Sequence, residues 1–305
     1  MKILVTGGAG FIGSAVARQF IREGHDVTIV DDFSSGHWSN LIPFAGNVVT
    51  LSLPGEASRL LGLRRFDIIS HQASITDTTV MDQRLMMTNN VEGFRAVLEA
   101  AAEWKSRVVW ASSASIYGQG HPPMVETQPP QPLNVYAYSK LAMERLAVRF
   151  GPRLAQPIVG LRYFNVYGPG EDHKGKFASM IHQLAKQMRA GERPRIFTAG
   201  QQKRDFVSVE DVVQANMKAL ECAQGGIFNV GSGQAASFNE VVRELNRALK
   251  TDLPPDYFEN PYSFTQDCTQ ADLTSSKSVL KYMPQYDLRR GIDAYLESGK
   301  LGTGA

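Results

Sequence analysis

The sequence predicts an α/β protein with a doubly wound parallel sheet and a smaller C-terminal lobe. Apolar strand-like runs alternate with helical segments through the first half of the 305 residues, as in sheets with helices on both faces. A glycine-rich loop directly follows the first apolar run, residues 3–5. From about residue 168 the alternation becomes irregular, which indicates a lobe built from segments that interrupt the sheet domain.

The elements of the sheet domain follow from continuous apolar runs and from helical periodicity. Such runs are typical of strands covered on both faces. A strand at 3–5 is followed by a helix over 11–22, which ends near Gly24. The further expected strands are 27–30, 66–70, 107–111 and 157–161, and the further helices are 79–102 and 136–150.

The second half contains helix-capping signals. Ser208 is a plausible N-cap, and Ser237 with Glu240 forms a capping box before a helix over 241–249. We also expect helices over 177–190 and 288–297, a strand at 195–197 and a disordered tail at 301–305. The predicted domains are residues 1–167, with a returning segment at about 206–232, and the remainder of 168–305.

Composition excludes several classes of protein. A net charge of +2 without long basic runs argues against nucleic-acid binding, and no apolar stretch approaches a membrane span. Residues 1–6 lead directly into a strand and the glycine loop, so we expect no cleavable signal. Cys222 and Cys268 lie in no C-x-x-C and predict reduced thiols in a cytoplasmic protein. We expect no metal, and interpret His71, His173 and His182 as strand-end, loop and helix-surface residues.

The glycine loop predicts a dinucleotide site. Gly7, Gly10 and Gly13 are spaced three residues apart between a strand and a helix. Glycines allow a tight turn and close approach to a pyrophosphate, and the helix N-terminus attracts its charge. Phe11 and Ile12 complete the predicted contact.

Two carboxylates predict which dinucleotide binds. Asp31 and Asp32 end the second strand, where a carboxylate can accept hydrogen bonds from the adenosine ribose and repel a 2′-phosphate. Residues 33–38 contain no Lys or Arg to hold that phosphate. We therefore expect NAD rather than NADP, with Asp31 on the ribose.

A tyrosine and a lysine, Tyr136 and Lys140, lie four residues apart and share one helix face. A nearby ammonium lowers the pKa of a phenol and makes it a usable acid or base. Tyr138 is the alternative phenol, but it is only two residues from Lys140. Ser113 follows the expected strand 107–111; Ser112 and Ser115 are alternatives to it.

The glycine loop, the serine-rich strand end and the Tyr/Lys pair, in this order, resemble the extended short-chain dehydrogenase/reductase family of sugar-nucleotide epimerases and dehydratases. The resemblance implies a Rossmann sheet. It assigns Ser113 to the reacting oxygen, Tyr136 to proton transfer and Lys140 to the nicotinamide ribose. It also implies cofactor contacts from Gln72, Ala73, Ser74, Asn89 (or its neighbour Asn90) and Val166, and a substrate contact from Asn165.

Further segments resemble one branch of this family, the ADP-L-glycero-D-manno-heptose 6-epimerases. They are 133–136, 172–179, 203–207 and 269–273, and the decisive one is His173-Lys-Gly. The resemblance implies that Lys174 is a second base and that Arg204 binds the nucleotide diphosphate. The other expected substrate residues are Thr76, Lys176, Gln183 and Thr265. The last three stand where the chain departs from the branch, as does Trp38, which replaces a basic residue associated with NADP.

The resemblance implies an NAD-dependent epimerase that inverts a carbinol of a nucleotide-diphosphate sugar through a ketone. Two bases favour an exocyclic C6 centre. Alternatives are a UDP-hexose 4-epimerase, a nucleotide-sugar 4,6-dehydratase and a non-catalytic NAD(H)-binding regulator. Members of this branch and related epimerases form homo-oligomers, so the resemblance implies that this chain does too.

Overall fold

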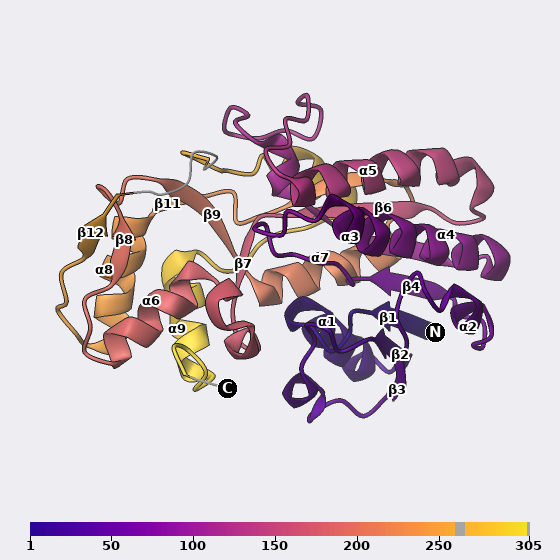
Figure 1. Cartoon of the computed structure of the whole chain (residues 1–305), viewed down its shortest axis with the longest axis horizontal. Helices are drawn as coiled ribbons and strands as arrows, with labels where there is room; N and C mark the ends of the chain where they lie inside the picture. Colours follow the sequence, from indigo (N-terminus) through magenta and orange to yellow (C-terminus); the bar gives the residue numbers. More distant parts are fainter. Residues whose placement is uncertain (260–265, 304–305) are drawn as a thin grey trace.

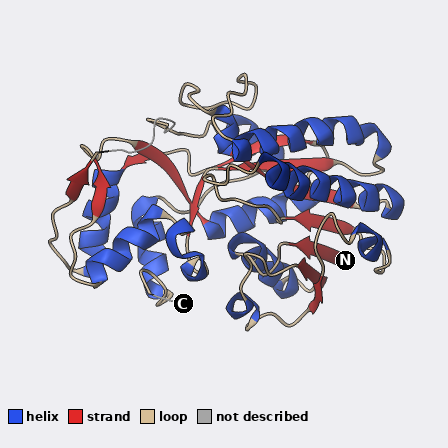
Figure 2. Cartoon of the chain, viewed as in Figure 1, coloured by secondary structure: helices blue, strands red, loops and turns tan. Residues whose placement is uncertain are grey.

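A computed structural model describes residues 1–259 and 266–303 and confirms the predicted fold class (Figures 1 and 2). A parallel seven-stranded sheet has the strand order β10-β6-β5-β4-β1-β2-β3. Its strands are β1 (Lys2–Thr6), β2 (Asp26–Asp31), β3 (Asn47–Thr50), β4 (Ile68–His71), β5 (Arg107–Ser113), β6 (Ile158–Tyr163) and β10 (Gly226–Val230).

The order of the strands reverses at β1. Ile3 of β1 pairs with Val27 of β2 on one side and with Ile68 of β4 on the other. In open parallel sheets, ligands bind outside the carboxyl ends of the strands at such a switch point. The glycine loop follows β1 and therefore lies at this position.

Helices cover both faces of the sheet because successive strand residues point to opposite sides. Ile3 and Val5 pack in a core with α1 (Phe11–Arg22) and α7 (Val209–Glu221). Leu4 packs in the opposite core, with α4 (Gly93–Trp104) and α5 (Val135–Phe150).

A smaller lobe extends from the sheet domain and has its own core (left side of Figure 1). Its helices are α6 (Met180–Arg189), α8 (Phe238–Leu249) and α9 (Leu288–Glu297). Its strands are β7 (Asn165–Tyr167), β9 (Lys203–Ser208) and β11 (Ala235–Ser237) in one sheet, and β8 (Arg195–Phe197) and β12 (Asp256–Phe258) in another.

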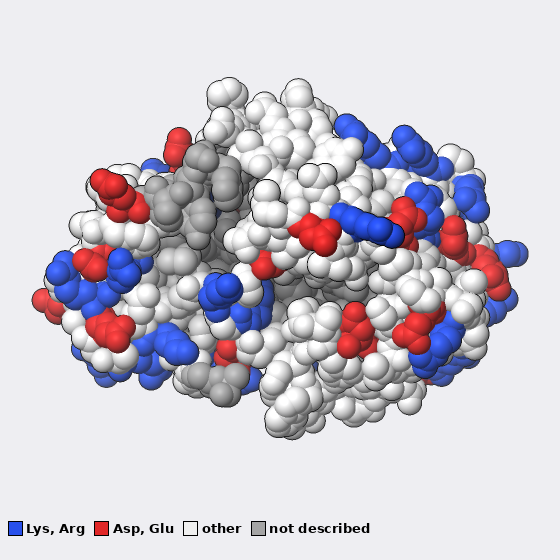
Figure 3. Space-filling model, in the orientation of Figure 1, with Lys and Arg blue, Asp and Glu red and all other residues white. Residues whose placement is uncertain are grey.

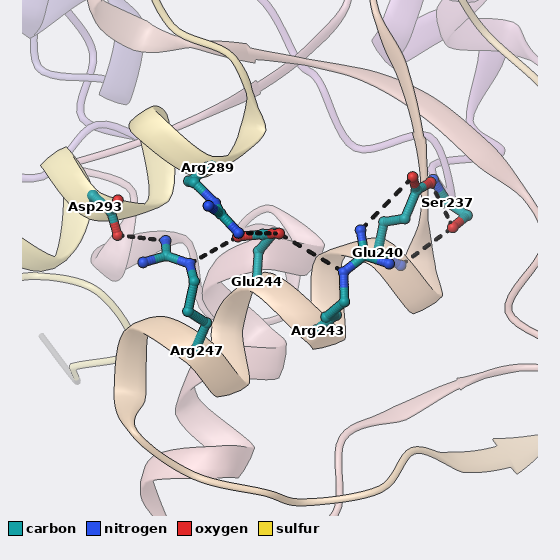
Figure 4. Close-up of polar contacts among 7 residues, drawn as sticks. All are labelled: Ser237, Glu240, Arg243, Glu244, Arg247, Arg289 and Asp293. Atoms are coloured by element: carbon teal, nitrogen blue, oxygen red, sulfur yellow. Dashed lines mark hydrogen bonds and ion pairs between the residues drawn. The ribbon is translucent and has the colours of Figure 1, made fainter.

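A cluster of charged side chains joins α8 to α9 (Figure 4). The Glu244 carboxylate accepts hydrogen bonds from Arg247 (2.9 Å) and from Arg289 (3.0 Å). Arg247 also bonds to Asp293 of α9 at 2.6 Å. Arg289, whose side chain is 63% exposed, thus links α9 to α8 from the surface.

The predicted capping residues are confirmed. Ser208 accepts from the Glu210 N–H, and Ser237 and Glu240 form the capping box before α8. The helix expected over 79–102 begins later than predicted, because the Asp82 side chain caps its N-terminus. It consists of α3 (Gln83–Met87), a π-helical turn (Thr88–Glu92) and α4.

Other expectations are corrected by packing. His182 is 3% exposed and bonds through Nδ1 to the Tyr295 hydroxyl at 2.8 Å, so it is a core residue and not a surface histidine. Leu301, placed in a disordered tail, is fully buried in the lobe. The strands β3, β7, β9, β10, β11 and β12 were not expected.

The remaining helices are short. They are α2 (Ala57–Leu61), a π-helical turn (Ser276–Leu280) and 3-10 turns at Trp38–Leu41, Ala114–Tyr117, Gly151–Arg153 and Asp172–Phe177. A membrane-crossing helix needs a long uninterrupted apolar segment, and none of the helices in the described part of the chain has one. Both cysteines are free.

Candidate functional site

The predicted site residues gather where the carboxyl ends of the parallel strands meet. The glycine loop follows β1, Asp31 ends β2, Gln72 follows β4, and Ser113 ends β5. On the face shown in Figure 3, acidic side chains lie among basic ones, and the surface is hollowed near its middle, between the sheet domain and the smaller lobe.

The glycine loop is shaped by close backbone packing. Gly7 has a φ of +69°, and a Cβ there would lie 2.5 Å from the Ala73 nitrogen. A Cβ on Gly13 would lie 2.1 Å from the Gly7 oxygen. At Gly10, the N-cap of α1, the nearest such contact is 3.2 Å, so its surroundings are more open. Gly7 and Gly13 thus form the turn, and Gly10 leaves the helix N-terminus accessible to an anion.

Asp31 is buried beside this loop. Its carboxylate accepts hydrogen bonds from the main-chain N–H groups of Ala9 and Phe33, both at 2.9 Å. Burial raises the pKa of Asp31, while the two N–H groups oppose that shift. Asp32 is exposed and bonds to the N–H and hydroxyl of Ser34. Asp31 therefore fixes the glycine loop, and its oxygens keep lone pairs for a ribose hydroxyl.

The last residue of β4, His71, and the residue after it, Gln72, belong to a polar layer at the site. His71 bonds through Nδ1 to the Thr6 hydroxyl at 2.7 Å, and burial lowers the pKa of His71 to about 3. The Gln72 amide bonds to Asn216 and to the Tyr163 hydroxyl, both at 3.1 Å. The layer holds the loop after β4 against the glycine loop.

Ser113, Tyr136 and Lys140 are brought together by β5 and α5. The Asn134 side chain caps α5 by accepting from the Ala137 N–H at 2.8 Å, which begins the helix just before Tyr136. The Tyr136 side chain lies close enough to the Ser113 side chain for Ser113 to lower the pKa of the phenol. Lys140 is 1% exposed, and its Nζ lies 5.8 Å from the centroid of the Tyr136 ring.

Two of the three alternatives to these residues are engaged or oriented differently. The Ser112 hydroxyl donates to Glu144 at 2.7 Å and is buried. Tyr138 is 47% exposed, so it points away from Lys140. The third alternative, the Ser115 hydroxyl, is buried and has no hydrogen-bond partner among the described residues.

The electrostatics of the pair differ from the sequence prediction. Burial raises the pKa of Tyr136, and the nearby Ser113 side chain opposes this shift. Burial also lowers the pKa of Lys140 to about 7. The expected lowering of the phenol pKa by Lys140 is not found, since burial of Tyr136 has the larger effect.

Asn89 and Asn90 lie in the π-helical turn. Asn90 is fully buried and bonds to the main chain of Ile75 and to the Ser139 hydroxyl at 2.9 Å. The Asn89 amide donates to the Leu85 carbonyl at 3.0 Å. Asn90 thus braces the residue beside Lys140, and a cofactor contact by Asn89 stays a prediction.

Lys174 lies in the 3-10 turn Asp172–Phe177, between β7 and α6. Its Nζ is 5.7 Å from the centroid of the Phe11 ring, at the start of α1. Burial lowers the pKa of Lys174, and Glu171 opposes the shift. Lys176, two residues later, is exposed, and its Nζ lies over the Phe177 ring. Burial is therefore the main cause of the lowered Lys174 pKa.

The remaining predicted site residues differ in exposure and in local contacts. Thr76 and Asn165 are exposed, and Val166 is half-buried. The Gln183 amide is used locally, since it donates to the carbonyls of Lys176 and Ala178. Arg204, on β9, lies over the Phe238 ring. Thr265 is outside the described residues.

Two buried carboxylates that support the site were not predicted. Glu144 pairs with Arg162 at 2.7 Å and ties α5 to β6. Glu171, fully buried, accepts from the Gly168 N–H and from the N–H and hydroxyl of Ser179, so it closes the loop that carries Lys174. Glu171 lies two positions before His173 of His173-Lys-Gly, and this proximity was the available signal. No sequence signal pointed to Glu144, because its partners Arg162 and Ser112 are distant in sequence.

The described residues contain no group of three or more His, Cys, Asp or Glu side chains placed to hold a metal ion. They do fit a dinucleotide: an open helix N-terminus for a pyrophosphate, a carboxylate beside it and a tyrosine–serine pair at the same sheet edge.

Comparison with known proteins agrees with this geometry. Residues 3–231 match the model of the NAD dependent epimerase/dehydratase family. The chain is 34% identical to the ADP-L-glycero-D-manno-heptose-6-epimerase of Alkalilimnicola ehrlichii, over 97% of each. The crystal structure of that enzyme from Helicobacter pylori has a TM-score of 0.91 and 42% identity, covering 97% of this chain and 95% of the other. A UDP-glucose 4-epimerase from Thermotoga maritima, with UDP-glucose, has a TM-score of 0.91 and 30% identity, covering 97% and 98%. This chain belongs to the NAD-dependent epimerase/dehydratase family.

Proposed function

We propose that this protein is an NAD-dependent epimerase that inverts a carbinol centre of a nucleotide-diphosphate sugar. The observation that carries the proposal is the placement of Ser113 and Tyr136 beside Lys140, at the sheet edge where the glycine loop opens. A purely binding protein has no need for this arrangement, so it argues against a non-catalytic NAD(H)-binding regulator.

Each residue has a separate task in the reaction. Tyr136 takes the proton from the hydroxyl of one epimer and, in the reverse direction, returns a proton to the same oxygen. Ser113 hydrogen-bonds the same oxygen, which keeps the carbinol facing the phenol. NAD, when bound, supplies reversible two-electron oxidation of the carbinol carbon. Lys140 binds the nicotinamide ribose, and a charged Lys140 favours the phenolate of Tyr136.

The substrate we propose is ADP-glycero-manno-heptose, inverted at C6. Its support is the identity to heptose epimerases over nearly the whole chain, together with the position of Lys174. A half-buried lysine with a lowered pKa can serve as a second acid or base. An exocyclic centre needs only local rotation of the sugar, so each epimer's hydroxyl can meet a different base. Such a product is a precursor of lipopolysaccharide.

A UDP-hexose 4-epimerase is the second candidate. The Thermotoga enzyme matches the fold as closely as the Helicobacter one, although at lower sequence identity. Lys176 and Gln183 also depart from the heptose-epimerase pattern. For a ring centre the whole sugar turns over, so one tyrosine is sufficient.

The two candidates are separated by substrate and by one substitution. The wild type and Lys174→Met are each given ADP-glycero-manno-heptose and UDP-galactose, and epimerisation is followed by NMR. We expect heptose turnover that Lys174→Met abolishes while cofactor content stays unchanged. Lys186→Met, which alters an exposed lysine on α6, is the matched control. Robust UDP-galactose turnover that is indifferent to Lys174→Met would overturn the heptose assignment.

The cofactor, the assembly and the compartment complete the proposal. Asp31 and the absence of cations in residues 33–38 support NAD over NADP. Mass analysis of the dinucleotide released on denaturation tests this choice. Two free cysteines fit a reducing cytoplasm. A homo-oligomer is expected, which sedimentation velocity can measure.

A further inference from the structure

A buried asparagine connects three segments at the edge of the site. Asn40 is 4% exposed, and its Nδ2 donates to the Ala9 carbonyl of the glycine loop at 3.0 Å. The Asn40 carbonyl accepts from Arg18 of α1 at 3.0 Å. The same Nδ2 lies 3.3 Å from Nδ1 of His173, which is 133 positions later in the chain. Asn40 thus joins the cofactor loop to the segment that carries Lys174.

The direction of this contact fixes the state of His173. An amide nitrogen only donates, so Nδ1 of His173 accepts and the ring proton is on Nε2. Burial lowers the pKa of His173 and so favours this neutral form. The Asn40 hydrogen bond and a neutral imidazole are therefore consistent with each other.

A second imidazole holds the ring of His173 in place. His37 bonds through Nδ1 to the Ser39 hydroxyl at 2.8 Å, which sets the orientation of its own ring. The rings of His37 and His173 stack with centroids 5.7 Å apart and an angle of 16°. His173 is therefore restrained by one hydrogen bond and one stacking contact, both from the segment after β2.

The position of His173 determines that of Lys174. Glu171 ties the two ends of the loop together through Gly168 and Ser179. Between those ends, His173 contacts the sheet domain, and Lys174 follows it directly with Nζ over Phe11.

We propose that Asn40 and His173 are a positioning pair that holds Lys174 against the cofactor loop, in the orientation needed for proton transfer. The role in proton transfer rests on the proposed function, whereas the placement of the loop does not. The pair also links the two halves of the site: displacement of the glycine loop moves Ala9, then Asn40, and then the residue beside Lys174.

Chemical labelling tests the placement without any substrate. The holoenzyme is acetylated with limiting reagent, and labelling of Lys174 relative to the exposed Lys176 is read by mass spectrometry. His173→Phe keeps a ring for stacking but removes the acceptor, whereas His173→Asn retains an acceptor in a similar position. We expect the Lys174/Lys176 ratio to rise roughly fivefold in His173→Phe, the effect of losing one neutral hydrogen bond. His173→Asn should stay near the wild type, as should His121→Phe, which changes an exposed histidine.

A double-mutant cycle tests the role in the reaction. His173→Phe should lower kcat more than it alters KM in the wild-type background, with little change in melting temperature. In the Lys174→Met background, the residual rate left after the loss of Lys174 is measured, and the same substitution should not lower it further, because His173 acts through Lys174.

The labelling experiment and the double-mutant cycle can each contradict a different part of the proposal. An unchanged labelling ratio in His173→Phe overturns the positioning pair, whatever the substrate. An equal loss of kcat in both backgrounds overturns the action through Lys174. Indifference of wild-type turnover to Lys174→Met overturns the proposed function, but the labelling result still decides the placement.

Discussion

The Nζ of Lys140 donates a hydrogen bond to the main-chain carbonyl of Ala111, 2.9 Å away, inside the protein. This contact joins α5 to the end of β5 two residues before Ser113. The Ala111 carbonyl holds the Lys140 side chain near Tyr136, and it brings no negative charge that would favour the charged amine. Burial therefore acts on the amine unopposed and lowers the pKa of Lys140 from 10.5 to about 7.

The lowered pKa of Lys140 predicts a pH-dependent stability. The unfolded chain binds one more proton than the folded chain between pH 7 and pH 10.5, so the free energy of unfolding rises with pH across this window. The slope for one proton is at most about 1.4 kcal/mol per pH unit. Denaturant unfolding of cofactor-free protein should show this slope in the wild type and lose it in Lys140→Met. Lys176→Met is the control, and equal slopes in all three proteins would contradict the assignment.

Tyr136→Phe should remove turnover while leaving the fold and NAD binding in place. The phenol hydroxyl contacts Ser113, and the ring itself remains in the variant. General acid–base catalysis contributes about 10²–10⁴-fold, so kcat should fall by at least that range. Tyr138→Phe, which alters an exposed phenol, is the matched control. Near-normal activity of Tyr136→Phe would remove this residue from the mechanism.

Asp31→Ala should weaken NAD binding by about 10–100-fold, since a hydrogen bond to a charged group contributes roughly 1.5–3 kcal/mol. Part of the lost NAD affinity comes from a less ordered glycine loop, because the Asp31 carboxylate also accepts a hydrogen bond from the Ala9 N–H of that loop. Calorimetric titration of cofactor-free protein with NAD measures the change. Asp32→Ala is the comparison, since Asp32 is exposed and bonds to Ser34. Unchanged NAD affinity in Asp31→Ala would refute the ribose assignment.

Glu144→Gln should destabilise the protein far more than Glu92→Gln. Glu144 and Arg162 form a pair whose side chains are each 7% exposed, and removing one charge leaves the other buried. Such a loss costs about 3–5 kcal/mol. Glu92 pairs with Arg95 at 2.8 Å, but these side chains are 49% and 41% exposed, so the expected cost is about 0–1 kcal/mol. Denaturant midpoints compare the two variants, and similar losses would contradict the difference in burial.

The local features of this chain could be predicted from its sequence. Apolar runs identified β1, β2, β5 and β6, and serine caps identified the starts of α7 and α8, because both signals depend on residues close together in the chain. The glycine spacing and the Tyr136–Lys140 spacing predicted a site for the same reason. The short strands β7, β9 and β11 gave no such signal, since each is defined by its partners in a small sheet.

The tertiary structure decided which side chains support those that the sequence identified. Asn40 reaches His173 across 133 positions, and Gln72 reaches Asn216 across 144. It also decided the charge state of Lys140, because the pKa depends on burial by segments that are remote in sequence. Sequence spacing determines which residues share a helix face or a turn. Burial and long-range hydrogen bonds arise only when the chain has folded, and they determine how Tyr136, Lys140 and Lys174 are placed and charged.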